Sequence, residues 1–170
     1  LDVSKITAFY RNNGYIESRV GEPQIEYQEN WIYITIKIDE GPRFKVGKVD
    51  ISGDLILSRE ELLEKVKISG ETYFNREVVR NDMLVLSDRY SDEGYAYVDI
   101  SPRIDKDHEK LIVNITYVVE KGKQVFFENI IIIGNKKTRD KVIRRELKVI
   151  EQELYSGRGL KRGVRNLYRL

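Results

Sequence analysis

The sequence predicts an α+β protein built from tandem β-α-α-β-β units, each with two helices packed on one face of a three-stranded mixed sheet. Two observations predict the repetition. The motif RNNGY at residues 11–15 returns as SDEGY at residues 91–95, a shift of 80 positions. The motif FKVGKVDISG at residues 44–53 returns as VFFENIIIIG at residues 125–134, a shift of 81 positions. Nearly equal shifts in both halves of the chain indicate a tandem array.

The repeat divides the 170 residues into three parts. We expect the C-terminal part of one unit at 1–41, a complete unit at 42–122 and the N-terminal part of a third unit at 123–170. The chain begins with LDVSK inside an expected helix, so we expect both ends to be boundaries of a piece of a longer protein. The longest apolar run, at residues 130–133, is much shorter than a membrane-spanning helix.

The first part predicts one helix followed by two strands. Apolar residues at spacings of three and four predict a helix over residues 1–13, which Gly14 ends. Residues 15–27 predict a strand interrupted by a glycine and a proline, and residues 28–30 predict a turn. Residues 31–39 alternate between apolar and polar, which predicts a strand with one covered face. That face carries Ile32, Ile34, Ile36 and Ile38.

The complete unit is expected to begin with a short strand over residues 44–53. Ser58 followed by Glu61 predicts a capping box, and hence a helix that continues to about residue 66. Asn75 predicts the cap of a second, longer helix. The expected inner face of this second helix consists of Val79, Met83, Leu86 and Tyr90.

The second half of this unit predicts a β-hairpin. Its strands are expected at residues 95–104 and 111–120, with a loop over 105–110. Pro102 cannot donate a hydrogen bond to a neighbouring strand, so the first of these strands is expected at a sheet edge. The strand at 44–53 can then join only the free side of the last strand. The expected inner face of the last strand consists of Leu111, Val113, Ile115, Tyr117 and Val119.

The third part repeats the beginning of the central unit. It predicts a strand over residues 125–133 and a helix from about 138 to 149, while residues 155–170 align with the second helix of the central unit. Glycines at positions 157, 159 and 163 would each weaken an isolated helix by roughly 1 kcal/mol relative to alanine. We therefore expect this end to fray or to depend on a neighbouring element.

No combination of residues predicts catalysis or a bound cofactor. The absence of cysteine excludes disulfides, zinc–thiolate sites and thiol nucleophiles. The single histidine, His108, lies in DKDHE, which lacks the fixed ligand order of a calcium loop and is interpreted as a solvated turn. GRGLKRG at residues 157–163 does not have the order of a phosphate-binding loop. We expect a protein that is not an enzyme and holds no metal or cofactor.

The end of the chain is basic. From residue 135 onward there are twelve Lys and Arg against four Asp and Glu, whereas residues 1–134 carry eighteen against twenty-four. A solvated helix face, an acidic protein partner and contact with a membrane surface through anionic headgroups all remain open as interpretations. Nucleic acid is not expected, because no binding motif is present and the rest of the array is acidic.

The expected edge strand is a candidate binding site. An exposed edge presents unpaired backbone N–H and C=O groups, to which an extended peptide can add as a strand with little demand on its sequence. The alternative is an ordinary edge, protected by Pro102 and Asp99. The candidate residues for a client peptide are Ala96, Tyr97, Val98, Asp99, Ile100 and Ser101.

Several motifs together resemble the POTRA (polypeptide-transport-associated) repeats of outer-membrane protein assembly factors. They are EGPRF at residues 40–44, ISG at 51–53, DEGYAY at 92–97, IGN at 133–135 and TRDKVIRREL at 138–147. The last of these motifs is similar to the start of the family's final, membrane-proximal repeat. The resemblance places the chain across the end of the third repeat, the whole fourth repeat and the start of the fifth. One departure is Glu151-Gln152, where the family usually places Glu-Gly.

The resemblance implies a periplasmic arm ahead of an outer-membrane β-barrel in a Gram-negative bacterium. Such an arm would handle unfolded outer-membrane proteins by strand addition and would dock accessory lipoproteins. Two alternatives remain, namely the POTRA arm of a related outer-membrane translocation or secretion protein and a purely structural spacer between partners. The residues that match the docking stretch of the last repeat are Arg144, Arg145 and Glu146.

Overall fold

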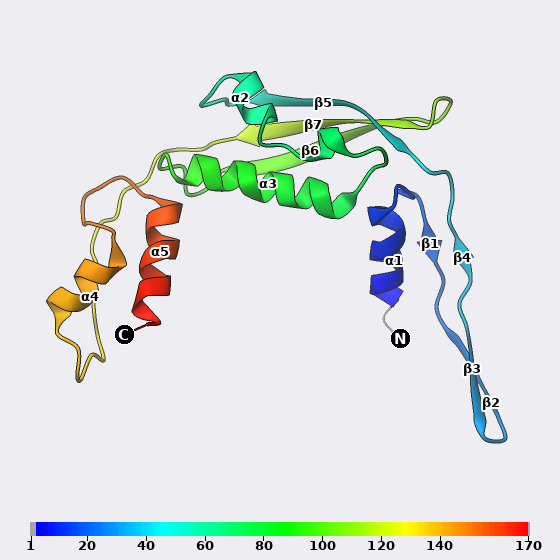
Figure 1. The fold of residues 1–170 in the computed structure, drawn as a ribbon, viewed down its shortest axis with the longest axis horizontal. Helices are drawn as coiled ribbons and strands as arrows, with labels where there is room; N and C mark the ends of the chain where they lie inside the picture. Colours follow the sequence, from blue (N-terminus) through cyan, green and yellow to red (C-terminus); the bar gives the residue numbers. More distant parts are fainter. Residues whose placement is uncertain (1–2, 170) are drawn as a thin grey trace.

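The computed structural model describes residues 3–169 and has the shape of an arch (Figure 1). The central unit lies at the top, and the first and third parts descend from its two ends. The helices predicted over 1–13 and 155–170 extend beyond the described range by two residues and by one residue. Within this range, no helix combines the length and the apolar character needed to cross a bilayer.

The central unit contains the mixed three-stranded sheet that the sequence predicts. Its strands are β5 (Lys45–Gly53), β6 (Asp99–Asp107) and β7 (Ile112–Glu120), in the order β5-β7-β6. β5 runs parallel to β7, and β6 runs antiparallel to it. The prediction from Pro102 is confirmed, because the strand that contains it lies at an edge.

The helices of the central unit begin at the caps that the sequence predicts. The Ser58 hydroxyl accepts from the backbone N–H of Glu61, whose carboxylate accepts from the N–H of Ser58. The Asn75 side chain accepts from two backbone N–H groups of the next helical turn. The first helix ends at Leu63, three residues before the predicted end. The elements are α2 (Arg59–Leu63), the 3₁₀ turn η1 (Ile68–Gly70) and α3 (Arg76–Ser91).

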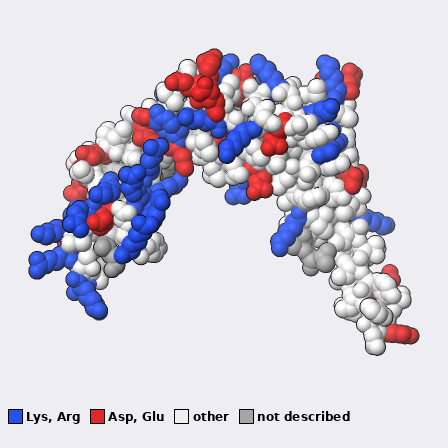
Figure 2. All heavy atoms as spheres, viewed as in Figure 1, with Lys and Arg blue, Asp and Glu red and all other residues white. Residues whose placement is uncertain are grey.

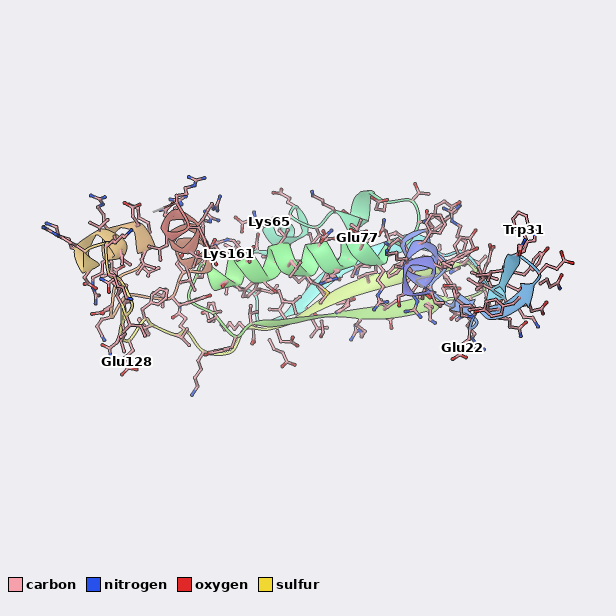
Figure 3. All side chains as sticks on the ribbon, turned by 90° about the horizontal axis from the view of Figure 1, so that it is seen from below. Glu22, Trp31, Lys65, Glu77, Glu128 and Lys161 are labelled. Carbon is pink, nitrogen blue, oxygen red and sulfur yellow. The ribbon has the colours of Figure 1, made fainter. Side chains whose placement is uncertain are left out.

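The core of the protein lies between α3 and one face of the sheet (Figure 3). The predicted inner faces of α3 and β7 are confirmed with one exception. Leu111 has a φ of 52° at the hairpin turn, which leaves its side chain 38% exposed. Burial of the other apolar side chains is the main source of stability in this unit. The largest buried apolar side chains are Phe44, Ile51, Leu62, Ile68, Leu86, Tyr90, Ile115 and Tyr117.

The edge strand begins four residues later than predicted. Residues 96–98 form a turn, in which the N–H of Ala96 donates to Gly94 O and the N–H of Val98 donates to Tyr95 O. Both backbone donors are therefore used locally. Half of the predicted client-binding run, 96–101, consequently lies outside the strand.

The first part forms two short ladders in place of one sheet. The prediction that residues 31–39 have a covered face is wrong, because Ile32 is 61% exposed and Ile34 is 45% exposed. The preceding helix packs against α3 and β1 and leaves this face open. The elements are α1 (Val3–Asn12), β1 (Arg19–Val20), β2 (Gln24–Gln28), β3 (Trp31–Thr35) and β4 (Ile38–Asp39), with β1 paired to β4 and β2 paired to β3.

The third part contains two helices, α4 (Asp140–Leu147) and α5 (Gly157–Leu167), but no strand within the described residues. The predicted strand at 125–133 is therefore wrong, and this segment makes only an isolated bridge between Phe126 and Leu154. The equivalent strand of the central unit, β5, pairs with a strand that follows the second helix. The described residues after α5 contain no such strand, so residues 125–133 have no ladder to join.

Gln152 replaces a glycine that the resemblance implies. Its φ of 66° lies in the left-handed region that glycine favours. The N–H of Gln152 donates to Phe127 O, and its side-chain amide donates to Glu128 O at 3.0 Å. These two hydrogen bonds hold the turn in this conformation.

Candidate functional site

The direction of the backbone groups along β7 determines which groups of β6 face outward. Val119 O accepts from the N–H of Asp54 at 3.0 Å, so the carbonyl of Val119 points toward β5. The N–H and C=O groups of successive residues alternate in direction along a strand, so those of Tyr117 also point toward β5 and away from β6. Pro102 lies opposite Tyr117, and its backbone therefore points away from β7. The backbone groups that also point away from β7 are those of Ile100, Ile104 and Lys106.

The outer edge of β6 thus offers carbonyl groups and a smaller number of donors. Pro102 has no N–H, and Ile100 is only 4% exposed. The accessible donors are therefore the N–H groups of Ile104 and Lys106. For these two groups the described structure records no backbone partner. Within the described residues, the outer edge of β6 has no neighbouring strand along residues 100–106, which lie beyond most of the predicted run at 96–101.

The opposite edge of the sheet is closed. The start of β5 pairs with an extended segment, in which Val46 N–H donates to Thr72 O and Phe74 N–H donates to Phe44 O, each at 3.1 Å. Farther along, the outward N–H of Ile51 donates to the carboxylate of Asp50 at 2.9 Å. The sheet therefore has one open edge and one protected edge.

Charged groups hold the Asp50 carboxylate in place on the protected edge. Lys48 Nζ lies 3.2 Å from this carboxylate, and Arg59 Nη1 lies 3.3 Å from it. The hydrogen bond from the N–H of Ile51 and the bond from Lys48 lower the pKa of Asp50 below its ordinary value. The carboxylate is therefore ionised at neutral pH and stays an acceptor for the edge N–H.

The hairpin end of the open edge contacts the first part of the chain. The Glu17 carboxylate bonds Lys106 Nζ, and it lies 3.1 Å from His108 Nε2. These two hydrogen bonds lower the pKa of Glu17. His108 thus lies at the hairpin turn, as predicted, and its ring also packs edge-on against Phe44. Within the described chain, no group of three His, Asp or Glu side chains could hold a metal ion.

Lys and Arg side chains gather over α4 and α5 (Figure 2). Arg144, one of the predicted docking residues, uses its guanidinium for contacts within the third part. Its guanidinium bonds Asp140 Oδ2 at 2.8 Å, Glu151 Oε1 at 3.0 Å and Ile130 O at 2.7 Å. The bonds to Asp140 and to Glu151 raise the pKa of Arg144. This side chain therefore joins α4 to the extended segment before it and to the turn after it.

Arg145 differs from Arg144 because its guanidinium is available at the surface. Its side chain is 69% exposed, and its recorded ion pair is with the neighbouring Glu146 at 3.1 Å. Glu146 is 25% exposed. Substitution of Arg145 removes only its ion pair with Glu146 within α4, whereas substitution of Arg144 also breaks the bonds to Ile130 and Glu151 outside the helix.

The third part also has an apolar hollow, formed where the predicted strand lies unpaired. Residues 130–134 form one wall, and Ile143, Leu147 and Leu167 from the two helices form the other. In the central unit the equivalent face is covered by the sheet. In the sequence, the wall at residues 130–134 has the same apolar pattern as a paired strand. The hollow could therefore not be distinguished from a paired strand by sequence.

Comparison with known proteins gives a consistent result. The model of the family described as "POTRA: Surface antigen variable number repeat" matches residues 1–41, 44–122 and 125–170. The outer membrane protein assembly factor BamA of Nitratidesulfovibrio vulgaris is 36% identical over 172 residues, which cover 99% of this chain and 22% of that protein. BamA of Neisseria meningitidis serogroup B is 35% identical over 164 residues, covering 95% of this chain and 21% of that protein. The chain spans about a fifth of the length of these curated relatives.

Two solved structures have the same fold. The crystal structure of Haemophilus influenzae BamA POTRA3-5 superposes with a TM-score of 0.84 at 22% identity, covering 99% of this chain and 67% of that chain. The structure of BamA from Haemophilus ducreyi lacking POTRA domains 1-3 superposes with a TM-score of 0.65 at 20% identity, covering 74% of this chain and 24% of that chain.

Proposed function

The chain belongs to the POTRA family, and from this membership we propose that it is a section of the periplasmic arm of an outer-membrane protein assembly factor. The BamA relatives support this assignment, because they match nearly the whole chain. The proposed role is non-enzymatic: the arm receives unfolded outer-membrane proteins and docks accessory lipoproteins.

The open edge of β6 carries the part of the proposal that concerns clients. A client segment would add as a strand along residues 100–106 and would accept from the N–H groups of Ile104 and Lys106. Main-chain pairing needs little sequence identity between clients, which suits a receptor for many barrel strands. The protected edge at β5 would take no part, because the Asp50 carboxylate already occupies its outward N–H.

Addition of a peptide with the alternating pattern of a barrel strand is expected to slow hydrogen exchange at the amides of Ile104 and Lys106. The amide of Arg103 faces β7 and is paired already, so its exchange rate should not change. Amide exchange followed by NMR measures these positions separately. Lys106→Pro removes the outward N–H and should weaken peptide binding, whereas Lys106→Ala keeps the N–H and serves as the matched control.

Three results would contradict this prediction. Changes confined to residues 96–98 would place the client on the turn before β6. Unchanged exchange along the whole edge at saturating peptide would favour a structural spacer. Equal binding by the proline and alanine variants would show that the backbone donor at position 106 is not used.

The exposed Arg145 supports the second part of the proposal, docking of an accessory lipoprotein through α4. Arg145→Glu is expected to weaken this binding by roughly tenfold, equivalent to about 1.4 kcal/mol, because an attractive charge becomes repulsive. Titration calorimetry with the purified lipoprotein measures the loss. Lys141→Glu, a reversal at another exposed position of α4, is the matched control. Equal losses for both variants would indicate that the overall positive charge of α4, and not Arg145 itself, determines the binding.

A further inference from the structure

The two joints between units are built from the same backbone contact. At the first joint, the N–H of Phe44 donates to Gly14 O at 2.9 Å. At the second joint, the N–H of Val125 donates to Gly94 O at 3.0 Å. The donors are 81 positions apart and the acceptors are 80 positions apart, which are the shifts of the sequence repeat. The beginning of each unit is thus bonded to the helix end of the unit before it.

A side chain repeats this connection one residue earlier. Arg43 Nε donates to Asn13 O at 2.8 Å in the first joint. Gln124 Nε2 donates to Glu93 O at 2.9 Å in the second joint. Arginine and glutamine are different residue types, but both supply an N–H to the equivalent carbonyl. The contact is therefore conserved between the joints although its sequence is not.

A third contact connects the long helices of successive units. At the first joint, Asn12 Oδ1 accepts from the N–H of Glu77 at 3.1 Å, in the first turn of α3. At the second joint, Asp92 Oδ1 accepts from the N–H of Arg158 at 2.8 Å, in the first turn of α5. Residues at the end of one long helix thus cap the beginning of the next long helix. Figure 3 shows Glu77 at the end of α3 that faces α1.

The side chains in this third contact differ in charge between the two joints. Asn12 Nδ2 donates to the Glu77 carboxylate at 3.2 Å, so the first joint pairs an amide with an acid. Arg158 Nη2 lies 2.8 Å from Asp92 Oδ2, so the second joint pairs a base with an acid that is only 14% exposed. Lys161 and Asp88 add a second ion pair at 2.6 Å. The positions equivalent to these two residues in the first joint are Arg80 and Ala8, which cannot form an ion pair.

We propose that this third contact is a conformational device: its side-chain pair determines which unit can follow which, and at the second joint it makes the contact between the long helices sensitive to salt. The repeated backbone contacts set a common geometry for both joints. The side-chain pair then determines whether that geometry is stable, because Asp at position 12 or Glu at position 158 would place two carboxylates against each other. Salt screens the two ion pairs between α3 and α5. At the contact between α1 and α3 the amide of Asn12 carries no charge to screen, and the ion pair that crosses the first joint is the separate one between Glu17 and Lys106.

The consequence is a movable connection between the open edge and the basic end. Loosening of the contact between α3 and α5 would let α4 and α5 swing relative to β6. This inference goes beyond the proposed function and does not depend on it, because it concerns only contacts within the chain.

Distances between spin labels test the proposal, and the absence of native cysteine allows labels at chosen sites. Glu60→Cys with Lys141→Cys spans the second joint, and Ser4→Cys with Glu60→Cys spans the first. Arg158→Glu is expected to broaden the distance distribution across the second joint. Adding Asp92→Asn recreates the amide–acid pair of the first joint and should restore the narrow distribution. In the unmodified sequence, 1 M salt should broaden the distance distribution across the second joint.

Three outcomes would overturn the proposal. They are an unchanged distribution in Arg158→Glu, no recovery in the double variant, and a distance across the second joint that 1 M salt leaves unchanged. Circular dichroism of each variant separates a loosened joint from an unfolded third part, because only unfolding removes helical signal. A variant that unfolds is replaced by Arg158→Gln, which removes the charge alone and is expected to weaken the salt dependence, because the ion pair between Lys161 and Asp88 remains.

Discussion

Replacement of Asp82 by asparagine is expected to lower the free energy of unfolding of the central unit by about 3 kcal/mol, since a buried acceptor of three hydrogen bonds is lost in part. Asp82 is only 1% exposed. Its Oδ1 accepts from the N–H of Lys67 at 2.9 Å, and its Oδ2 accepts from the N–H of Ile68 at 3.0 Å. The hydroxyl of Tyr117 donates to Oδ2 at 3.1 Å. An asparagine would turn an NH₂ group toward at least one of these donors.

The three donors come from different parts of the unit, so Asp82 connects α3 to η1 and to β7. Burial and the nearby Asp82 carboxylate raise the pKa of Tyr117, which keeps its hydroxyl protonated and able to donate. Urea unfolding followed by far-UV circular dichroism measures the loss in the free energy of unfolding. Tyr117→Phe removes one donor and should cost about 1 kcal/mol. A loss for Asp82→Asn no larger than that for Tyr117→Phe would show that the backbone donors find other partners.

Replacement of Gly163 by alanine is expected to displace α5 from α4 and to destabilise the third part by roughly 3 kcal/mol. A Cβ built at this position would lie 1.8 Å from Leu147 O and 2.6 Å from the carbonyl carbon of Leu147. Both are backbone atoms at the end of α4, so the clash cannot be relieved by a change of rotamer. Helix propensity alone predicts the opposite sign, because alanine is favoured over glycine by about 1 kcal/mol within a helix.

Hydrogen exchange at the amides of α5 measures this effect locally, without interference from the more stable central unit. Gly70→Ala is a suitable control, because a Cβ at Gly70 meets no atom within 4 Å. It is expected to leave exchange in both helices unchanged. Increased protection of α5 in Gly163→Ala would mean that propensity outweighs the close packing of the two helices.

The elements of the central unit could be predicted because their signals are local. The capping box at Ser58 and the cap at Asn75 lie within one helical turn of the groups they bond. The edge position of β6 could be predicted because Pro102 lacks an N–H wherever it lies. The tandem array and its family resemblance follow from the same local motifs, which recur at fixed spacing.

The local geometry of the candidate site could be predicted only in part. The sequence placed the client-binding run at residues 96–101, but a turn uses the donors of Ala96 and Val98. Ile104 and Lys106 lie two and four residues after Pro102, so their backbone groups share its outward orientation and are the donors of this edge. Arg144 could not be distinguished from Arg145 by sequence, because its partner Ile130 is 14 positions away and Glu151 is 7 positions away.

The sequence by itself determined the repeat, the helices and the identity of the edge strand, because these depend on side chains and backbone groups within a few residues. Tertiary structure decided whether an apolar, alternating run became a strand. The runs at β5 and at residues 125–133 have the same pattern, but only β5 lies beside β7. A helix satisfies its own backbone groups, whereas a strand needs those of another segment, and that segment can be far away in the sequence.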